Sequence, residues 1–203
     1  MDTKALRMEL LSMAAEDRAV REELARNGSL YEGYHPRMRA LHEHNAARLH
    51  AVLEEHGWPG RSLVGEEAAE AAWLILQHAI GNPSLQRRGL SLLEAAAAAD
   101  DVPMIHVAML EDRIRCNEGK GQRYGTQLDW DEDGLLSPLP IDDAANVDKR
   151  RSEIGLAPLA QEVRRKRQLA AESGERPPQD WNARQSEKER WLCSTGWRKA
   201  LAE

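Results

Sequence analysis

Apolar side chains recur every three or four residues through the first half of the chain, which is the spacing of amphipathic helices. The first such segment carries Leu6 and Leu10 and ends at Asn27-Gly28, a typical helix stop. Glycine and proline separate the segments that follow, at residues 57–59 and 81–83. The pattern therefore predicts five helices, at residues 3–26, 36–56, 65–80, 83–99 and 103–116.

The pattern changes after Gly119. Two short segments, residues 122–130 and 135–141, flank an acidic turn and predict a β-hairpin. A short helix at residues 142–151 and a basic helix at residues 157–171 are expected to follow the hairpin.

These elements predict a mainly α fold, a multi-helix bundle or helical-repeat-like core with one small β-hairpin. We expect a single helical domain over residues 1–172, which includes the hairpin at about 122–141. Residues 173–180 contain Gly174 and two prolines and are expected to form a linker. A C-terminal amphipathic helix is expected at residues 181–203.

Composition narrows the class of protein. The 203 residues are 41% hydrophobic and 31% charged, as in globular proteins. The net charge of -6 argues against general attraction to nucleic acid or to anionic membranes. The longest apolar stretch, residues 68–80, is too short to span a bilayer, and no signal peptide is recognisable. Cys116 and Cys193 match no metal-ligand spacing, so we expect free thiols in a cytoplasmic protein.

His78 is the first candidate for chemistry, because it follows Gln77 at the end of an otherwise apolar helix. A neutral imidazole can accept or donate a proton near pH 7, which suits general acid–base catalysis. The alternative is a histidine that caps the end of the helix or satisfies a buried carbonyl.

Charged and polar side chains later in the chain could complete a site. Asp112 and Arg113 follow an apolar run, where charged groups need partners. Asp112 could orient the histidine and Arg113 could hold an anionic group, or the two could form an internal salt bridge with the basic helix. Gln122, Tyr124 and Thr126 would share one strand face, which favours either hydrogen bonding to a polar ligand or an exposed surface.

The second predicted helix carries a further polar stretch. Asn45 lies three residues after His42 on the same face, so Asn45, like Gln77, is a candidate for substrate binding. His42, His44 and His78 could together bind a metal ion. However, the rings of a His-x-His pair point apart on a helix, and no Glu-x-x-His motif lies within a predicted helix, so a metal site is the weaker alternative.

Several motifs stand in a fixed order along the chain: Gly57-Trp58-Pro59, Gln77-His78, Glu111-Asp112-Arg113, Gly121-Gln122 and Tyr124-Gly125-Thr126-Gln127. In this ordered set the chain resembles a bacterial family that is catalogued only as a domain of unknown function. The resemblance covers roughly residues 42–159. It singles out the polar residues but implies no established activity.

Three functions are consistent with these residues. The first is an enzyme that acts on a small polar or anionic metabolite, with His78 and Asp112 as catalytic residues. The second is a non-catalytic binding module, such as an immunity or regulatory protein. The third is a metal-dependent oxidase or hydrolase that uses the clustered histidines. No cofactor motif is present, so no cofactor is expected, and association between identical copies is left open.

Overall fold

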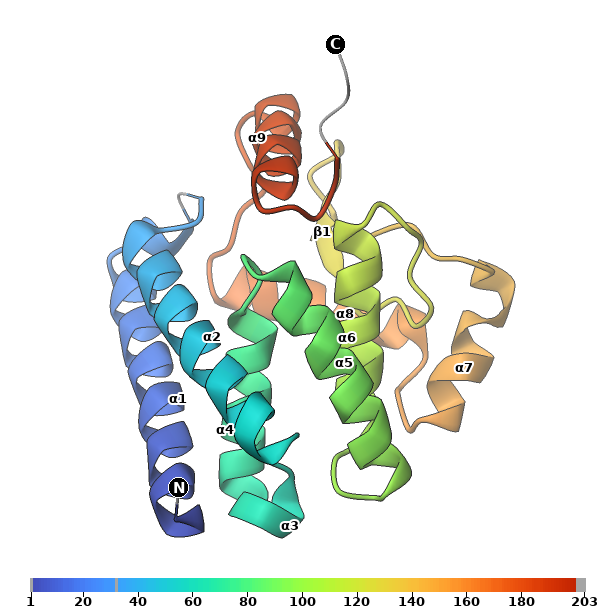
Figure 1. Ribbon diagram of the computed structural model, residues 1–203. Helices are drawn as coiled ribbons and strands as arrows, with labels where there is room; N and C mark the ends of the chain where they lie inside the picture. Colours follow the sequence, from blue (N-terminus) through green and yellow to red (C-terminus); the bar gives the residue numbers. More distant parts are fainter. Residues whose placement is uncertain (1, 32, 200–203) are drawn as a thin grey trace. The chain divides into compact units, whose positions relative to one another are not determined.

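Helices make up most of the computed structural model, which describes residues 2–31 and 33–199 (Figure 1). By its internal contacts the chain divides into an N-terminal unit, Met1–His106, and a C-terminal unit, Val107–Glu203. The predicted fold class, mainly α with one small hairpin, is confirmed. The single domain expected over residues 1–172 stays a prediction.

The N-terminal unit is built from helices whose ends are marked in the sequence. Asp2 and Asn82 accept hydrogen bonds from backbone amides at the starts of two of them, the usual role of such residues at a helix N-terminus. The predicted helices are confirmed to within one or two residues at each end. In chain order the elements are α1 (Thr3–Arg26), η1 (Ser29–Tyr31), α2 (Pro36–His56), α3 (Arg61–Val64), α4 (Glu66–His78), α5 (Pro83–Ala98) and the start of α6 (Met104–Asn117).

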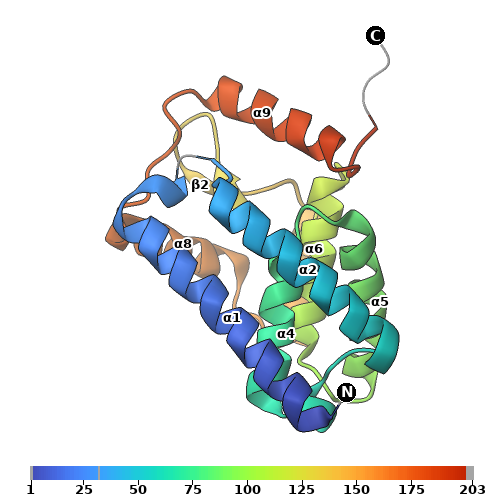
Figure 2. The same cartoon turned by 60° about the vertical axis from the view of Figure 1, so that its left-hand side comes forward.

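Helices α1, α2 and α4 pack against one another and form the core of the N-terminal unit (Figure 2). Leu10 of α1 and Leu76 of α4 are fully buried there. Trp58 and Trp73 are only 8% and 5% exposed, so their predicted burial is confirmed. Helix α5 approaches α4 closely at Gly89, where an added Cβ would lie 2.6 Å from the Leu76 side chain. The close approach explains a glycine inside a helix.

The C-terminal unit contains the hairpin and the later helices. Strands β1 (Leu128–Trp130) and β2 (Leu136–Pro138) are antiparallel, and Asp129 pairs with Ser137 at the centre of the ladder. The helical elements that follow are η2 (Ala144–Asn146), α7 (Val147–Glu153), α8 (Leu159–Glu172) and α9 (Trp181–Ser194).

The two strands are shorter than predicted. Residues 122–127 do not continue β1, apart from a single bridge between Gln122 and Ile141. The backbone turns at Gly125, whose φ of +66° lies in the left-handed region and interrupts an extended strand. The expected row of Gln122, Tyr124 and Thr126 on one strand face was therefore wrong.

The C-terminal segment also differs in length from the prediction. Helix α9 ends at Ser194, followed by Gly196 with a φ of +82°, a common helix stop. Residues 200–203, which the predicted helix included, lie outside the described residues. The indole N–H of Trp181 donates to the carbonyl of Trp130 at 3.0 Å and ties the start of α9 to the hairpin.

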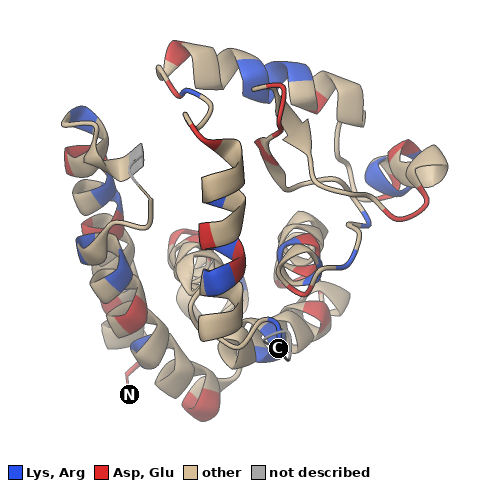
Figure 3. Cartoon of the chain, turned by 90° about the horizontal axis from the view of Figure 1, so that it is seen from above, with Lys and Arg blue, Asp and Glu red and all other residues tan. Residues whose placement is uncertain are grey.

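Lysine and arginine are interspersed with aspartate and glutamate along the same helices (Figure 3). This mixture fits the modest net charge of the sequence. Among the described residues, no helix combines the length and the apolar character that crossing a bilayer would require.

Candidate functional site

Asp112 on α6 is fully buried and accepts four hydrogen bonds from one loop of the C-terminal unit. Its carboxylate receives the backbone N–H groups of Arg123 at 2.7 Å, Tyr124 at 3.1 Å and Thr126 at 3.0 Å. The Thr126 hydroxyl donates the fourth hydrogen bond, also at 3.0 Å. Both carboxylate oxygens are thus occupied by the loop that carries the Tyr-Gly-Thr-Gln motif.

Gln122 closes the same loop from its other end. Its side chain is fully buried, and Nε2 donates to the carbonyls of Gln127 and Leu139, each at 2.9 Å. Its Oε1 accepts the N–H of Gln127 at 2.6 Å. Arg151, only 1% exposed, donates to the carbonyl of Tyr124 at 2.6 Å. These contacts satisfy buried backbone groups that have no place in a regular sheet.

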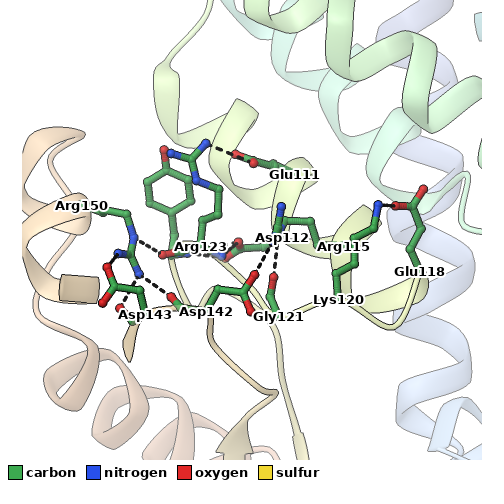
Figure 4. Close-up of polar contacts among 11 residues, drawn as sticks. Glu111, Asp112, Arg115, Glu118, Lys120, Gly121, Arg123, Asp142, Asp143 and Arg150 are labelled. Atoms are coloured by element: carbon green, nitrogen blue, oxygen red, sulfur yellow. Dashed lines mark hydrogen bonds and ion pairs between the residues drawn. The ribbon is translucent and has the colours of Figure 1, made fainter. Parts of the chain in front are cut away.

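Ion pairs surround this loop (Figure 4). Arg123 pairs with Glu111 at 3.3 Å, and Arg150 donates to the carbonyl of Arg123 at 2.7 Å. An added Cβ at Gly121 would lie 2.8 Å from the backbone nitrogen of Asp142, so the chain passes too closely there for any side chain. The motif-rich region is therefore a tightly satisfied structural centre, which we call the Asp112 centre (Asp112, Gln122 and residues 123–127).

Arg113 lies at the edge of the Asp112 centre. The residue is half-buried, and its Nε donates to Oε1 of Gln127 at 3.3 Å. Burial lowers the pKa of Arg113 to about 10, so the guanidinium remains charged at neutral pH. Its predicted role in holding an anionic ligand stays a prediction.

A second cluster of polar side chains lies in the core of the N-terminal unit. Asp17 of α1 is 1% exposed, and its Oδ2 lies 2.9 Å from Nδ1 of His78 on α4. The same oxygen lies 3.1 Å from Nε2 of His42 on α2. The two imidazole rings are 4.8 Å apart between centroids. We call these three residues, supplied by three helices, the Asp17 cluster.

The charge state of Asp17 decides whether its carboxyl group donates or accepts hydrogen bonds. Burial raises the pKa of the carboxyl, but the hydrogen bond from His78 and the nearby imidazole of His42 outweigh burial, and the pKa is lowered from 3.8. Asp17 is therefore ionised at neutral pH and can only accept hydrogen bonds. Nδ1 of His78 must then carry the proton, which leaves the lone pair of Nε2 on the other side of the ring.

His42 is also held from the connector between η1 and α2. The hydroxyl of Tyr34 lies 2.8 Å from Nδ1 of His42, and burial raises the pKa of Tyr34 to about 12. The hydroxyl is therefore neutral and can donate or accept. Nε2 of His42, although close to Asp17, has no hydrogen-bond partner among the described residues.

The other candidate residues of the N-terminal unit divide into buried and exposed. Asn45 is 2% exposed, and neither polar atom of its amide has a hydrogen-bond partner within residues 2–31 and 33–199. His44 is exposed on the opposite side of α2 and is not part of the Asp17 cluster. Gln77 offers its backbone carbonyl to Nε2 of Gln86 at 3.3 Å. Because Gln86 also binds the carbonyl of Leu76, at 2.9 Å, it supplies the helix cap that was considered for His78.

The structure thus brings the candidate residues together in two groups. Asp112, Gln122, Tyr124 and Thr126 meet in the C-terminal unit, while His78 meets His42 in the N-terminal unit. Convergence of both groups on one shared pocket stays a prediction. Asp17 itself was missed, although it lies seven residues after Leu10 on the apolar stripe of α1, and a lone carboxylate in that position is a usable signal.

A cavity of about 310 Å³ in the C-terminal unit is lined by the end of α6 and by α9. Its basic side chains each have an acidic partner: Lys120 with Glu118, Lys188 with Asp129 and Arg198 with Glu189. None of the predicted site residues lines this cavity. It therefore offers no unbalanced charge for an anionic ligand.

The chain matches no curated protein and no solved structure. Residues 4–171 match a family of unknown function, DUF6624, and this segment contains both the Asp112 centre and the Asp17 cluster. Helix α9 lies outside the matched segment. The resemblance to an uncharacterised family is thereby confirmed, and the chain belongs to DUF6624.

Proposed function

We propose that this protein is an enzyme that acts on a small polar or anionic molecule, with the Asp17 cluster as its reactive centre. One observation carries the proposal: a buried, ionised carboxylate is shared by two imidazole rings from different helices. Burying such a charge is costly, and groups with perturbed pKa values gather at functional sites. The Asp112 carboxylate, in contrast, has every oxygen occupied by its own loop.

His78 is the proton-transfer residue of this proposal. Asp17 holds the proton on Nδ1, so the lone pair of Nε2 can accept a proton from a substrate and return it later. His78 is also the exposed member of the cluster, with 23% of its side chain accessible against 9% for His42. A substrate would therefore meet the cluster at the His78 ring. Asp17 takes the orienting role that the sequence assigned to Asp112.

The burial of the groups behind the His78 ring limits the substrate. Asp17 and Asn45 are at most 2% exposed, so only a small group can pass beyond the His78 ring. The unpartnered amide of Asn45, one helical turn from His42, could donate to and accept from such a group. A polar end of a small metabolite fits this requirement better than a large polymer does.

The test compares two histidine variants of α2 and α4. Turnover of phosphate monoesters, carboxylate esters and small amides is followed by NMR for wild type, His78→Gln and His44→Gln. We expect His78→Gln to abolish the turnover shown by the wild type, whereas the exposed His44→Gln retains it. Equal turnover by the two variants would contradict the proposal. Absence of turnover in the wild type for all three classes would favour the non-catalytic binding module.

A further inference from the structure

We infer that Asp17, His42 and His78 bind a single divalent transition-metal ion. The inference rests on the proposed function in placing the reactive centre at the Asp17 cluster, and it names what that centre holds. It replaces the three-histidine set considered from the sequence. His44 is exposed and gives way to Asp17, which comes from a different helix.

The distances suit one small ion. One ligand atom from each of the three residues lies within 4.8 Å of the other two. Around zinc, with bonds of about 2.0–2.1 Å, tetrahedral ligand atoms are separated by roughly 3.4 Å. The contacts from Asp17 to His78 and His42, at 2.9 Å and 3.1 Å, need to lengthen by only a few tenths of an ångström by this measure. The widest separation among the three ligand atoms, within 4.8 Å, would have to close by up to about 1.4 Å to reach the same value.

Unpartnered buried atoms occur in this cluster and on the same buried face of α2. Within the described residues, Oδ1 of Asp17, Nε2 of His42 and both amide atoms of Asn45 are buried without a hydrogen-bond partner. Buried polar atoms are rarely left unpaired, because the loss of their hydration is not compensated. Asn45 lies one turn along α2 from His42 on the same buried face. An ion with a bound water would satisfy the carboxylate, the imidazole and the amide together.

Tyr34 supplies the outer support that metal-bound histidines usually have. To bind an ion through Nε2, His42 must carry its proton on Nδ1. The neutral hydroxyl of Tyr34, 2.8 Å from Nδ1, can accept that proton in a hydrogen bond. His78, which faces the cluster through Nδ1, must move the proton from that nitrogen to Nε2 or release it to solvent when the ion binds.

The ligand set indicates the kind of ion. Two imidazole nitrogens and one carboxylate oxygen suit zinc or iron(II), whereas calcium and magnesium prefer oxygen ligands throughout. Three protein ligands leave coordination positions for water or substrate, as in catalytic sites. A water on such an ion can lose its proton near pH 7, so the ion would take over the proton transfer assigned to His78. Its positive charge would also attract an anionic substrate.

The experiment measures metal binding directly, on full-length protein purified without an affinity tag. The protein is stripped with a chelator and titrated with Zn²⁺ and with Co²⁺, using calorimetry and the visible spectrum of bound Co²⁺. We expect about one equivalent to bind to wild type and to His44→Gln. His42→Gln and His78→Gln should bind at least about 100-fold more weakly, because each removes a ligand. Thermal melts establish that each variant is folded.

A spectroscopic readout covers the case in which a variant does not fold. In wild-type protein, Zn²⁺ should shift the ¹⁵N resonances of His42 Nε2 and His78 Nδ1 and leave those of His44 unchanged. Failure of wild type to bind Zn²⁺ or Co²⁺, or an equal loss in His44→Gln, would overturn the inference. Turnover that depends on His78 but not on metal would overturn the metal site and leave the proposed function. If the metal binds but turnover depends neither on the metal nor on His78, the metal site stands and the proposed function is overturned.

Discussion

Two buried aspartates of this protein have almost the same exposure and very different surroundings. Asp112 is 0% exposed and Asp17 is 1% exposed. Asp112 receives three backbone amides and a hydroxyl from a single loop. Asp17 faces two imidazoles from two other helices and keeps one oxygen unpartnered among the described residues. Burial alone therefore does not distinguish a carboxylate that supports a loop from the one proposed to be reactive; the chemistry of the neighbouring groups does.

The difference has a chemical basis. Backbone amides have fixed protonation, so a carboxylate bound to them has nothing with which to exchange a proton. Imidazoles change protonation near neutral pH and can also bind metal ions. The motif-rich region holds the C-terminal unit together, whereas the region with fewer motifs carries the groups that can react.

The largest expected effect follows from removing the acceptor at the Asp112 centre. Asp112→Ala leaves three backbone amides and one hydroxyl without a partner, at about 1–3 kcal/mol each. We expect the free energy of unfolding to fall by roughly 5 kcal/mol or more. Urea denaturation measures this loss, and the exposed acid Glu132 provides the control, since Glu132→Ala should change stability by less than about 0.5 kcal/mol. A similarly small change in the free energy of unfolding for Asp112→Ala would contradict the structural role of Asp112.

In the N-terminal unit, the largest expected loss of stability comes from deleting a buried aromatic side chain. Trp73→Ala deletes a buried indole that stacks on His106 with ring centroids 4.5 Å apart. The expected loss is about 3–5 kcal/mol, the usual range for a large core aromatic. A urea melt that shows a loss under about 1 kcal/mol would contradict the place of Trp73 in the core.

The Asp17 cluster should contribute less to stability than the Asp112 centre. In chelator-treated protein, Asp17→Asn should cost about 2 kcal/mol, because a neutral amide replaces the buried carboxylate that accepts the hydrogen bond from His78. The folded-state pKa of Asp17 lies below its unfolded value of 3.8. Its contribution is therefore present above about pH 4 and is lost as the pH falls further. Denaturation of wild type and variant at pH 7 and pH 3 should show the difference shrinking; a constant difference would contradict the ionised carboxylate.

A third buried group gives the smallest effect and a different pH window. Burial lowers the pKa of His106 from 6.5 to about 4, so the unfolded chain binds more protons between these values. Stability from this group is complete well above pH 6.5 and falls by about 1.6 kcal/mol between pH 6.5 and pH 5. His106→Gln should flatten this part of the curve, whereas the exposed His50→Gln should not. Parallel slopes for the two variants would rule out His106 as the source.

The helices could be predicted from the sequence because their signals are local. The apolar spacing of α1 and α2 and the stops at Gly28 and Gly57 depend on neighbours within one or two turns. The length of β1 could not be predicted, because the conformation of residues 122–127 is decided by Asp112 on a different element. The spacing of apolar residues does not indicate a contact between two separate elements.

The candidate residues were predicted better than their partners. His78 stood out at the end of an otherwise apolar helix and His42 in a polar stretch of the second helix, and both lie in the Asp17 cluster. Asp112 accepts backbone N–H groups that the sequence did not indicate, since a carboxylate next to an apolar run can serve the backbone as well as a histidine. The contact of His78 with Asp17 spans 61 positions, and only the packing of α1 on α4 creates it.

The tight passage of the chain at Gly121 bears on how natural variation in this family should be interpreted. Any larger residue would collide with the backbone of Asp142, so selection for a folded chain is enough to keep this position fixed. The same holds for Asp112, whose loop depends on both of its oxygens. Invariance of such positions in an alignment would follow from the fold alone. It would therefore not by itself mark where a substrate binds.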